Sequence, residues 1–528
     1  MLTYFVVVPI LIAVFLYLFH FKTTRVIAIV VQLAIFVASG YLFLMTQGGD
    51  YFITNVGNHD SVLGIMLRAD NLSSVFILLS AFVFLIAAIY SFHEYKSRLF
   101  WFLLFLWEGL LIGVFLTRDF FNVFVLMEGA NVVVAVLIMY HRDKRSMYDG
   151  VIYLMVNIVV MQFYLFGLGY LYMLTGALDM DAVGERIGAL DRATLFLPYA
   201  LIMTFVGLKC ALVPLFHWLP KAHGTPGAPS AISAVLSGLH IKSGVYMFLR
   251  FQDVFSEVAA SHFFLAIGIA SAIVGVVMAL AQTDIKLILA YSTIAQVGLI
   301  ITGLNIPDSY THIGSLYYII NHTLFKSALF LSAGMIIKIS GTRDITKIRG
   351  VLRHNPVIGI ATVMACLGII GTPFFGGSVS KYFMMANVGL PLTIVMIIIN
   401  LGTILVFIRF SQILFGTFAP HGKVERPDRG QLATTFVLGV SCLALGVLGE
   451  QVIEFLFGVR ASVDFASYVE KMAIFAVSLV AGYFITKMSA KTTAPLRALM
   501  QRTDLGFRGI CVSIGAFFAM VLLAARLL

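Results

Sequence analysis

Long apolar stretches follow one another along the whole chain, and short polar segments separate them. Each stretch is about 18 to 25 residues long, the length that an α-helix needs to cross the hydrocarbon of a bilayer. The predicted spans lie near residues 3–20, 26–46, 70–92, 99–117, 120–140, 150–174, 196–218, 230–250, 262–282, 286–304, 311–337, 356–385, 391–416, 432–457, 467–486 and 509–527. This pattern predicts an all-α, polytopic membrane protein with about 16 transmembrane helices.

Basic residues are distributed unequally between the two sides that these spans define. With the loop at 20–25 assigned to the cytoplasm and the sides alternating, 22 of the 35 Lys and Arg residues fall in cytoplasmic loops and six in the opposite loops. Since cytoplasmic loops carry an excess of Lys and Arg, this split supports the number of spans and predicts both termini on the outer side of a cell inner (plasma) membrane. The cytoplasmic group consists of Lys22, Arg25, Lys96, Arg98, Arg142, Lys144, Arg145, Lys221, Lys286, Lys338, Arg343, Lys347, Arg349, Arg353, Lys423, Arg426, Arg429, Lys487, Lys491, Arg497, Arg502 and Arg508. The outer group consists of Arg68, Arg118, Arg186, Arg192, Arg250 and Arg460.

Composition excludes several classes of protein. Hydrophobic residues make up 60% of the 528 positions and charged residues only 11%, whereas soluble domains are about one quarter charged. Soluble enzymes, disordered scaffolds and nucleic-acid binders are therefore excluded, and we attribute the net charge of +10 to the cytoplasmic loops. The sequence lacks GxGxxG after a strand, GxxxxGK[ST], HExxH and any Cys-rich cluster. We therefore expect no nucleotide, iron–sulfur or zinc cofactor, and a chain that is not itself an enzyme.

Seven charged residues lie well inside the predicted spans. A charge near the bilayer centre costs at least about 2.5–3.5 kcal/mol, and such residues commonly mark ion pathways, although some only hold helices together. Burial lowers the pKa of a lysine and a nearby carboxylate raises it again, while histidine titrates near neutral pH. His240 and His322 are therefore added as candidates, and His322 shares a helix face with Lys326 four residues later. The seven residues are Glu108, Glu128, Lys209, Lys242, Lys326, Lys381 and Arg409.

Two of the spans carry helix breakers beside a buried lysine. Pro214 follows Lys209, while Pro373 and the pair at 376–377 precede Lys381. Proline removes a backbone donor, and freed backbone at membrane depth is tolerated only where protein or a watery cavity covers it. Two such breaks about 170 residues apart favour an inverted-repeat transporter core. We expect helices four to eight (99–250) and nine to thirteen (251–416) to be the repeats, flanked by further transmembrane helices at 1–98 and 417–528.

Four stretches carry a resemblance to a known family. GLKCALVPLFHWLPKAHGTPGAPSAISAVLSGLHIKSGVYMFLR resembles the central signature of the antiporter-like subunits of respiratory complex I. The same family includes the large subunits of Mrp-type multisubunit cation/proton antiporters and of membrane-bound hydrogenases. TRDFFNVFVLMEGANVVV, ALAQTDIKLILAYSTIAQVGLI, and NHTLFKSALFLSAG followed by GTPFFGGSVSK agree in order. The resemblance covers roughly residues 100–410.

The resemblance implies roles for individual residues. Glu128 matches the acid of helix five, and Lys209 the helix-seven lysine with which that acid pairs. Lys242 matches the connecting lysine of helix eight, and Lys381 the terminal lysine of the second broken helix. His322 and Lys326 lie in the block that resembles the helix-eleven relay. Glu108 departs from the pattern, and we expect it to be a second partner for the charges or a contact to a neighbouring subunit.

The leading hypothesis is a proton-translocating subunit, with Na+/H+ antiport left open, that moves protons along buried Glu, Lys and His residues. Its expected partners are other membrane subunits, protons, a candidate sodium ion and membrane lipid. A Mrp-type antiporter, with this chain similar to its D component, is favoured slightly by FHWLPKAHGTPGAPSAISAVLSGL and LDMDAVGERIG. The alternative is the membrane arm of a complex I-like dehydrogenase or hydrogenase. A non-conducting assembly scaffold and a solitary transporter of an organic solute are weaker alternatives.

Overall fold

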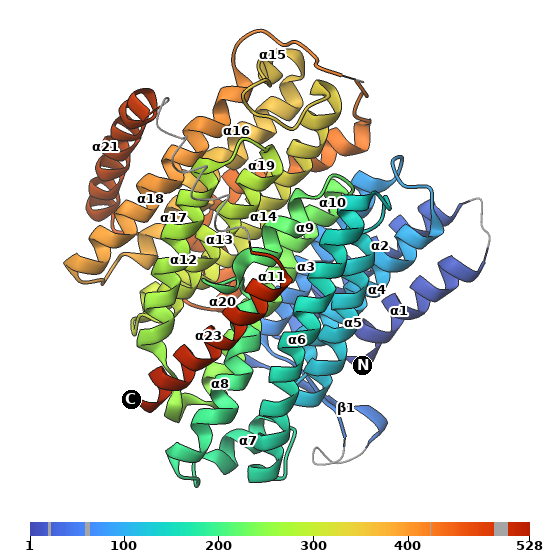
Figure 1. The fold of residues 1–528 in the computed structure, drawn as a ribbon, viewed down its shortest axis with the longest axis vertical. Helices are drawn as coiled ribbons and strands as arrows, with labels where there is room; N and C mark the ends of the chain where they lie inside the picture. Colours follow the sequence, from blue (N-terminus) through green and yellow to red (C-terminus); the bar gives the residue numbers. More distant parts are fainter. Residues whose placement is uncertain (20–22, 59–63, 423, 490–504, 528) are drawn as a thin grey trace.

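The structure, a computed structural model, describes residues 1–19, 23–58, 64–422, 424–489 and 505–527 (Figure 1). Fourteen helical segments in this part of the chain are long and apolar enough to cross a membrane, and the helices at Thr3–Leu18 and Pro356–Ile370 are shorter but apolar. The helices are α1 (Thr3–Leu18), α2 (Thr24–Met45), α3 (Asn71–Ser91), α4 (Arg98–Leu116), α5 (Phe120–Ile138), α6 (Lys144–Thr175), α7 (Met180–Ile187), α8 (Arg192–Lys209), α9 (Trp218–Gly224), α10 (Ser230–Val235), α11 (Ile241–Val254), α12 (Ser261–Ala281), α13 (Ile285–Leu304), α14 (Ser309–Ser340), α15 (Val351–His354), α16 (Pro356–Ile370), α17 (Gly376–Met384), α18 (Leu390–Ser411), α19 (Arg429–Val447), α20 (Gly449–Phe457), α21 (Phe465–Ser489) and α23 (Phe507–Arg526).

Every predicted span has a helix, or two helices separated by a break, at its position, which confirms the polytopic helical fold. Two details differ from the predictions. A two-stranded antiparallel sheet, β1 (Phe52–Asn55) with β2 (Met66–Ala69), stands between α2 and α3. The predicted span at 432–457 is interrupted at Leu448, where α19 ends and α20 begins. Five of the basic residues assigned to the cytoplasm lie outside the described residues, namely Lys22, Lys423, Lys491, Arg497 and Arg502.

Aspartate side chains start many of the helices. A carboxylate at the N-cap accepts hydrogen bonds from backbone N–H groups that the first helical turn leaves unpaired. Asp70, Asp119, Asp143, Asp284 and Asp308 do this for α3, α5, α6, α13 and α14 respectively. Much of the small acidic content of this chain is therefore used at helix starts.

A spacing of 165 residues relates two halves of the core. An isolated bridge joins Asp119 to Asp179, and an equivalent bridge joins Asp284 to Asp344. α6 and α14 are both 32 residues long, and each ends at a left-handed glycine, Gly176 or Gly341. The span that contains α13 comes five crossings after α5, so the two run in opposite directions through the membrane. The repeat is therefore inverted, as the sequence predicts.

Both predicted breaks are present. α8 ends at Lys209, and the chain passes through Ala211, at φ 50°, and a 3-10 turn (η3, Leu215–His217) before α9 begins. α16 ends at Ile370, and Phe374, at φ 70°, precedes α17. Positive φ values are uncommon for residues other than glycine. The backbone at each break therefore leaves the helical path close to a buried lysine.

The last two helices of the described chain cover different repeats. α21 packs against α18, and stands at the edge of the molecule (Figure 1). α23 lies across the first repeat, where it contacts α8, α6 and η3. The two C-terminal helices thus reach the two broken helices separately.

Candidate functional site

Lys209 is buried at the C-terminal end of α8, with 1% of its surface exposed. Its ammonium donates hydrogen bonds to the side-chain oxygens of Asn131 on α5 and Asn157 on α6, the second at 2.6 Å. Gly244 allows α11 to approach closely here, because a Cβ atom at that position would lie 2.8 Å from the Lys209 backbone. Two amides and a tight helix contact therefore fix the ammonium.

Glu128 does not pair directly with Lys209, in contrast to the expectation from the resemblance. Its Oε2 accepts a hydrogen bond of 3.3 Å from Nδ2 of Asn131, whose Oδ1 accepts from Lys209. Glu128 is half-buried, and Asn131 is fully buried. The asparagine is three residues after the acid and therefore lies on the same helix face. The carboxylate of Glu128 and the ammonium of Lys209 are thus both hydrogen-bonded to the side-chain amide of Asn131.

Lys242 is held by a π-helical segment that joins α10 to α11. This segment, η4 (Leu236–His240), was not predicted from sequence. Nζ of Lys242 donates to the backbone oxygen of Ser237 at 2.6 Å, and the Ser237 hydroxyl lies 2.7 Å from the hydroxyl of Thr293 on α13. π-Helical turns are rare and occur frequently at functional sites. Here the irregular backbone supplies a carbonyl to a buried ammonium.

Lys326 on α14 follows Lys209 and Lys242 as the third member of a row of intramembrane lysines that ends at Lys381, and its side chain is fully buried. Its Nζ donates to the backbone oxygen of Leu289 at 2.9 Å and to the hydroxyl of Ser292. The hydroxyl of Thr293 donates to the same Leu289 oxygen, also at 2.9 Å. Lys326 and Thr293 thus share one carbonyl acceptor, and the Thr293 hydroxyl also contacts that of Ser237, the residue whose backbone oxygen accepts from Lys242.

The two predicted histidines differ in their surroundings. His240 has a partner at each ring nitrogen, because Trp107 Nε1 donates to Nδ1 at 3.4 Å and the Tyr153 hydroxyl lies 3.2 Å from Nε2. Neither ring nitrogen of the fully buried His322 has a hydrogen-bond partner in the part of the chain that the structure describes, and the same holds for His223. His240 is therefore held at both ring nitrogens, whereas His322 is held at neither.

Lys381 lies on α17 and points back to the end of α16. Its Nζ donates to the backbone oxygen of Ile369 at 2.8 Å and to Oδ1 of Asn400 at 2.7 Å. The same nitrogen lies 5.6 Å from the centre of the Tyr318 ring. A Cβ atom at Gly371, which has φ +82°, would lie 3.1 Å from Cδ of Lys381, so the break itself makes room for the side chain. The lysine thereby meets the negative end of a helix dipole.

Glu108 is not brought together with this row. It is fully buried among the N-terminal helices, where Nε2 of Gln32 donates to its Oε1 at 2.6 Å. This placement disagrees with the expected role as a partner of the other charges, and burial inside the chain disagrees with a contact to a neighbouring subunit. Arg409, the remaining charged residue of the predicted spans, is half-buried and donates to the backbone oxygen of Leu280.

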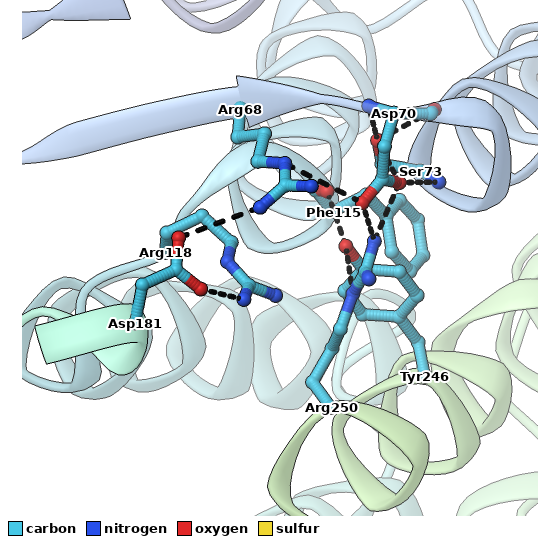
Figure 2. Close-up of polar contacts among 8 residues, drawn as sticks. All are labelled: Arg68, Asp70, Ser73, Phe115, Arg118, Asp181, Tyr246 and Arg250. Atoms are coloured by element: carbon cyan, nitrogen blue, oxygen red, sulfur yellow. Dashed lines mark hydrogen bonds and ion pairs between the residues drawn. The ribbon is translucent and has the colours of Figure 1, made fainter. Parts of the chain in front are cut away.

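The six arginines of the outer group are held by contacts within the chain. Figure 2 shows Arg68 and Arg118 converging on Asp181, and Arg250 on Asp70. Arg192 pairs with Glu257 and Arg460 with Glu454, while Arg186 donates to the Thr175 carbonyl. Each of the six arginines that we predict on the outer side thus has a polar partner in this chain.

The cluster in Figure 2 also ties distant segments together. Arg250, near the end of α11, contacts both carboxylate oxygens of Asp70 at 2.6 and 2.7 Å, and its Nε donates to the Tyr246 hydroxyl at 3.0 Å. That hydroxyl donates to the backbone oxygen of Phe115 at 2.7 Å. Burial raises the pKa of Asp70, but the charge and hydrogen bonds of Arg250 outweigh burial and lower it below its ordinary value. The cluster therefore links the start of α3 to the ends of α4 and α11.

Sequence reasoning missed the neutral partners of the lysines. Asn131, Asn157 and Asn400 carry polar amides inside apolar spans. A polar side chain within a membrane is costly to bury, so these residues could have been selected from the sequence for that reason alone. The Ser237 and Leu289 carbonyls could not have been found, since a backbone acceptor leaves no sign in the sequence. No group of three or more His, Cys, Asp or Glu residues able to hold a metal ion occurs in the part of the chain that the structure describes.

Together, the fold and the site define a multi-pass membrane protein with an inverted repeat, two broken helices and a row of intramembrane lysines. Residues 117–408 match the family described as "NADH:quinone oxidoreductase/Mrp antiporter, TM". The chain belongs to this family, as the sequence resemblance predicts.

Named relatives come from both branches of the family. The chain is 30% identical over 388 residues to the D component of the Na(+)/H(+) antiporter of Alkalihalophilus pseudofirmus, covering 71% of this chain and 78% of that protein. It is 30% identical over 421 residues to the N component of the NADH-quinone oxidoreductase of Desulforudis audaxviator, covering 74% and 83%.

Solved structures agree with this fold. A chain of the Mrp complex from Dietzia sp. has a TM-score of 0.79 at 20% identity, covering 90% of this chain and 99% of that one. A chain of respiratory complex I from Thermus thermophilus has a TM-score of 0.76 at 22% identity, covering 91% and 100%. The fold neighbours are thus members of multisubunit membrane assemblies.

Proposed function

We propose that this chain is a proton-translocating subunit of a multisubunit membrane complex of the Mrp antiporter type. The observation that carries the proposal is the chemistry around Lys209, Lys242, Lys326 and Lys381. All four are buried, and their hydrogen-bond partners are amides, carbonyls and hydroxyls. Among the described residues, no carboxylate forms an ion pair with any of them.

Neutral partners matter because they do not hold a lysine in its charged state. A carboxylate at contact distance stabilises the ammonium, whereas dipoles in a low-dielectric interior compensate only part of the cost of burying the charge. Each lysine can therefore lose its proton when a neighbour becomes charged, since like charges disfavour one another. Protons then move in steps, with Glu128 and Asn131 at one end of the row and Lys381 at the other.

The geometry supports an order for these steps. Lys209 lies where α8 and α11 meet, and Lys242 lies two residues before Gly244 at that contact. The hydroxyls of Ser237 and Thr293 lie between the backbone oxygen that accepts from Lys242, on Ser237, and the one that accepts from Lys326, on Leu289. Tyr318 is two helical turns before Lys326 on α14, and its ring contacts Lys381. His322, with two unpaired nitrogens between these positions, can hold a proton in transit.

The proposal includes the setting of the chain. It places the repeats at 99–250 and 251–416, the flanking helices at 1–98 and 417–528, and both termini on the outer side of the plasma membrane. Protons are the transported ion, and exchange for sodium is the function named for the antiporter relative. Any redox chemistry would belong to other subunits.

The test replaces the central pair in the assembled complex. Glu128→Gln and Lys209→Ala should each reduce ion transport by at least about tenfold while the complex still assembles, because each removes a proton-carrying group. If the two act as one unit, the double variant should lose little more than either single variant. Normal transport by Lys209→Ala would overturn the proposal, and a non-conducting scaffold would be the remaining interpretation.

The relative named as part of an NADH-quinone oxidoreductase supports a second candidate for the complex to which this chain belongs. In that case the chain is a proton-pumping subunit in the membrane arm of a redox-driven complex. Purification in mild detergent separates the two, because small antiporter subunits would accompany the chain in one case and dehydrogenase or hydrogenase subunits in the other. Isolation as a lone, active transporter would contradict both.

A further inference from the structure

A cavity of about 230 Å³ opens beside Lys381. Residues of α17, α18 and α21 line it, including Lys381, Asn400, Tyr468, Glu470 and Lys471. One water occupies about 30 Å³ of the liquid, so the space holds several waters. Asn400, which accepts a hydrogen bond from Lys381, also lines the cavity. The final lysine of the row is therefore next to space that water can fill.

The N-terminal turns of α21 are fastened onto α17 at this cavity. Nζ of Lys471 donates to the backbone oxygen of Tyr382 at 2.9 Å and lies 4.4 Å from the centre of its ring. The hydroxyls of Tyr468 and Ser378 are 3.0 Å apart. The backbone N–H of Asp464 donates to the Tyr382 hydroxyl at 3.0 Å. Four contacts at one end of the helix make α21 a wall of the cavity.

Glu470 is the acid among the residues that line this cavity. The other titratable groups facing the space are Lys381 and Tyr382 on α17, and Tyr468 and Lys471 on α21. Glu470 is exposed, whereas only 6% of the Lys381 surface is exposed. The cavity therefore has a buried amine, Lys381, and a more exposed carboxylate, Glu470, that can accept a proton from it.

We infer that α21 supplies the proton-release site of this chain, with Glu470 as the acceptor and Lys471 as a positioning residue. The inference rests on the proposed function. An N–H bond of the Lys381 ammonium breaks, and the proton passes through cavity water to form an O–H bond on the Glu470 carboxylate. Lys381 is left as a neutral amine, and the Glu470 carboxylic acid then loses the proton to bulk water. Lys471 keeps α21 seated on Tyr382 while its positive charge disfavours a second ammonium at Lys381.

The α21 side of this site lies outside the part of the chain that matches the family, whereas Lys381 and Asn400 lie inside it. The family match ends at residue 408, and α21 begins at Phe465. The core thus provides the row of lysines, whereas the C-terminal addition provides the group that receives the proton from the last of them.

The first test compares acids at the same end of the molecule in the complete complex, reconstituted in vesicles. Glu470→Gln should reduce proton transport by at least about tenfold, because it removes a proton carrier, and Glu470→Asp should restore most of it. Glu454→Gln is the matched control, since Glu454 pairs with Arg460 and does not line the cavity. Equal, near-normal rates for Glu470→Gln and Glu454→Gln would overturn the inference. If Lys381→Ala is inactive in that experiment, the proposed function stands and only the release site is wrong.

The second test separates position from charge and measures access. Lys471→Arg should transport normally, because arginine can donate to the Tyr382 carbonyl and stack on its ring, whereas Lys471→Met should not. In a Cys511→Ser background, Ser478→Cys should react with a membrane-impermeant maleimide added outside, because Ser478 lines the cavity. Buried Cys442 is the unreactive internal control. An unreactive Ser478→Cys would show that the cavity is not open to the outer solution in the way the inference requires and would overturn it.

Discussion

The two broken helices use a similar break in different ways. Lys209 ends α8, has two asparagine partners and is 1% exposed. Lys381 follows its break on α17, has one asparagine and one backbone carbonyl as partners, and lines a cavity of about 230 Å³. In the function proposed above, the first lysine exchanges protons with other protein groups and the second exchanges them with water. The two lysines differ in their surroundings and share the break, so we assign the difference in role to the surroundings.

The largest expected effect is the loss of transport when a titratable lysine becomes a permanent charge. Lys381→Arg and Lys381→Ala should both assemble and both transport poorly, because arginine stays protonated in proteins and alanine carries no proton. Proton flux in vesicles measures this directly. Near-normal flux in Lys381→Arg would mean that position 381 supplies only a fixed positive charge, and the difference between the two broken helices would then need another explanation.

A smaller effect is expected when a neutral partner becomes an acid. Asn131→Asp places a carboxylate against Lys209 in a sealed interior and should fix the ammonium by an ion pair of several kcal/mol. Asn400→Asp does the same to Lys381, but water in the adjacent cavity should screen the pair. We expect flux to fall by at least about tenfold more in Asn131→Asp than in Asn400→Asp. Leucine at each position is the control for loss of the amide, and equal losses in the two aspartate variants would contradict the comparison.

The smallest effect on transport should come from the charged cluster of Figure 2, which links the start of α3 to the ends of α4 and α11. Asp70→Asn retains an N-cap residue but loses the ion pair with Arg250, so the free energy of unfolding should fall by about 2 kcal/mol with little change in flux. The pKa of Asp70 is lowered in the folded protein. Its contribution is therefore present above the unfolded pKa near 3.8 and disappears as the pH falls through the lower folded value.

Thermal unfolding of the purified protein at pH 7 and at pH 3 checks the prediction for Asp70. The difference between the parent and Asp70→Asn should shrink at the lower pH. Arg192→Gln, which breaks an exposed pair with Glu257, is the matched control and should change stability by less than about 1 kcal/mol. A difference that stays constant with pH would contradict the assigned ion pair.

The sequence alone predicted the positions of the membrane spans and of the two helix breaks. Apolar length located the spans, and Pro214 and Pro373 located the breaks, because both signals are local. The same reasoning could not place Glu108, since its burial against Gln32 depends on how α2 packs on α4. The π-helical turn at η4 and the β1–β2 sheet were also missed. A π-helical turn is defined by its backbone hydrogen bonds, and each of the two strands has only four residues, so neither leaves a clear pattern in the sequence.

The interruption at Leu448 has a tertiary cause. Gly446 lies against the backbone of Phe374 and Phe375 at the second break, and Gly449 lies against Val379 on α17. The apolar pattern at 432–457 contains no sign of that contact, so a continuous helix was the reasonable prediction. For the lysines, sequence identified the charged groups and missed their neutral partners, which determine whether each lysine can lose its proton.

The position of α23 has a consequence for the synthesis of the protein. Phe517 on α23 packs at Gly207, two residues before Lys209, and its ring also contacts that of Phe263. The ribosome makes a chain from its N-terminus, so this face of α8 stays uncovered until α23 has been made and inserted. A chain that stops before residue 507 would present that face to lipid or to quality-control proteases. Packing around this face of α8 is therefore completed only after α23 has been inserted.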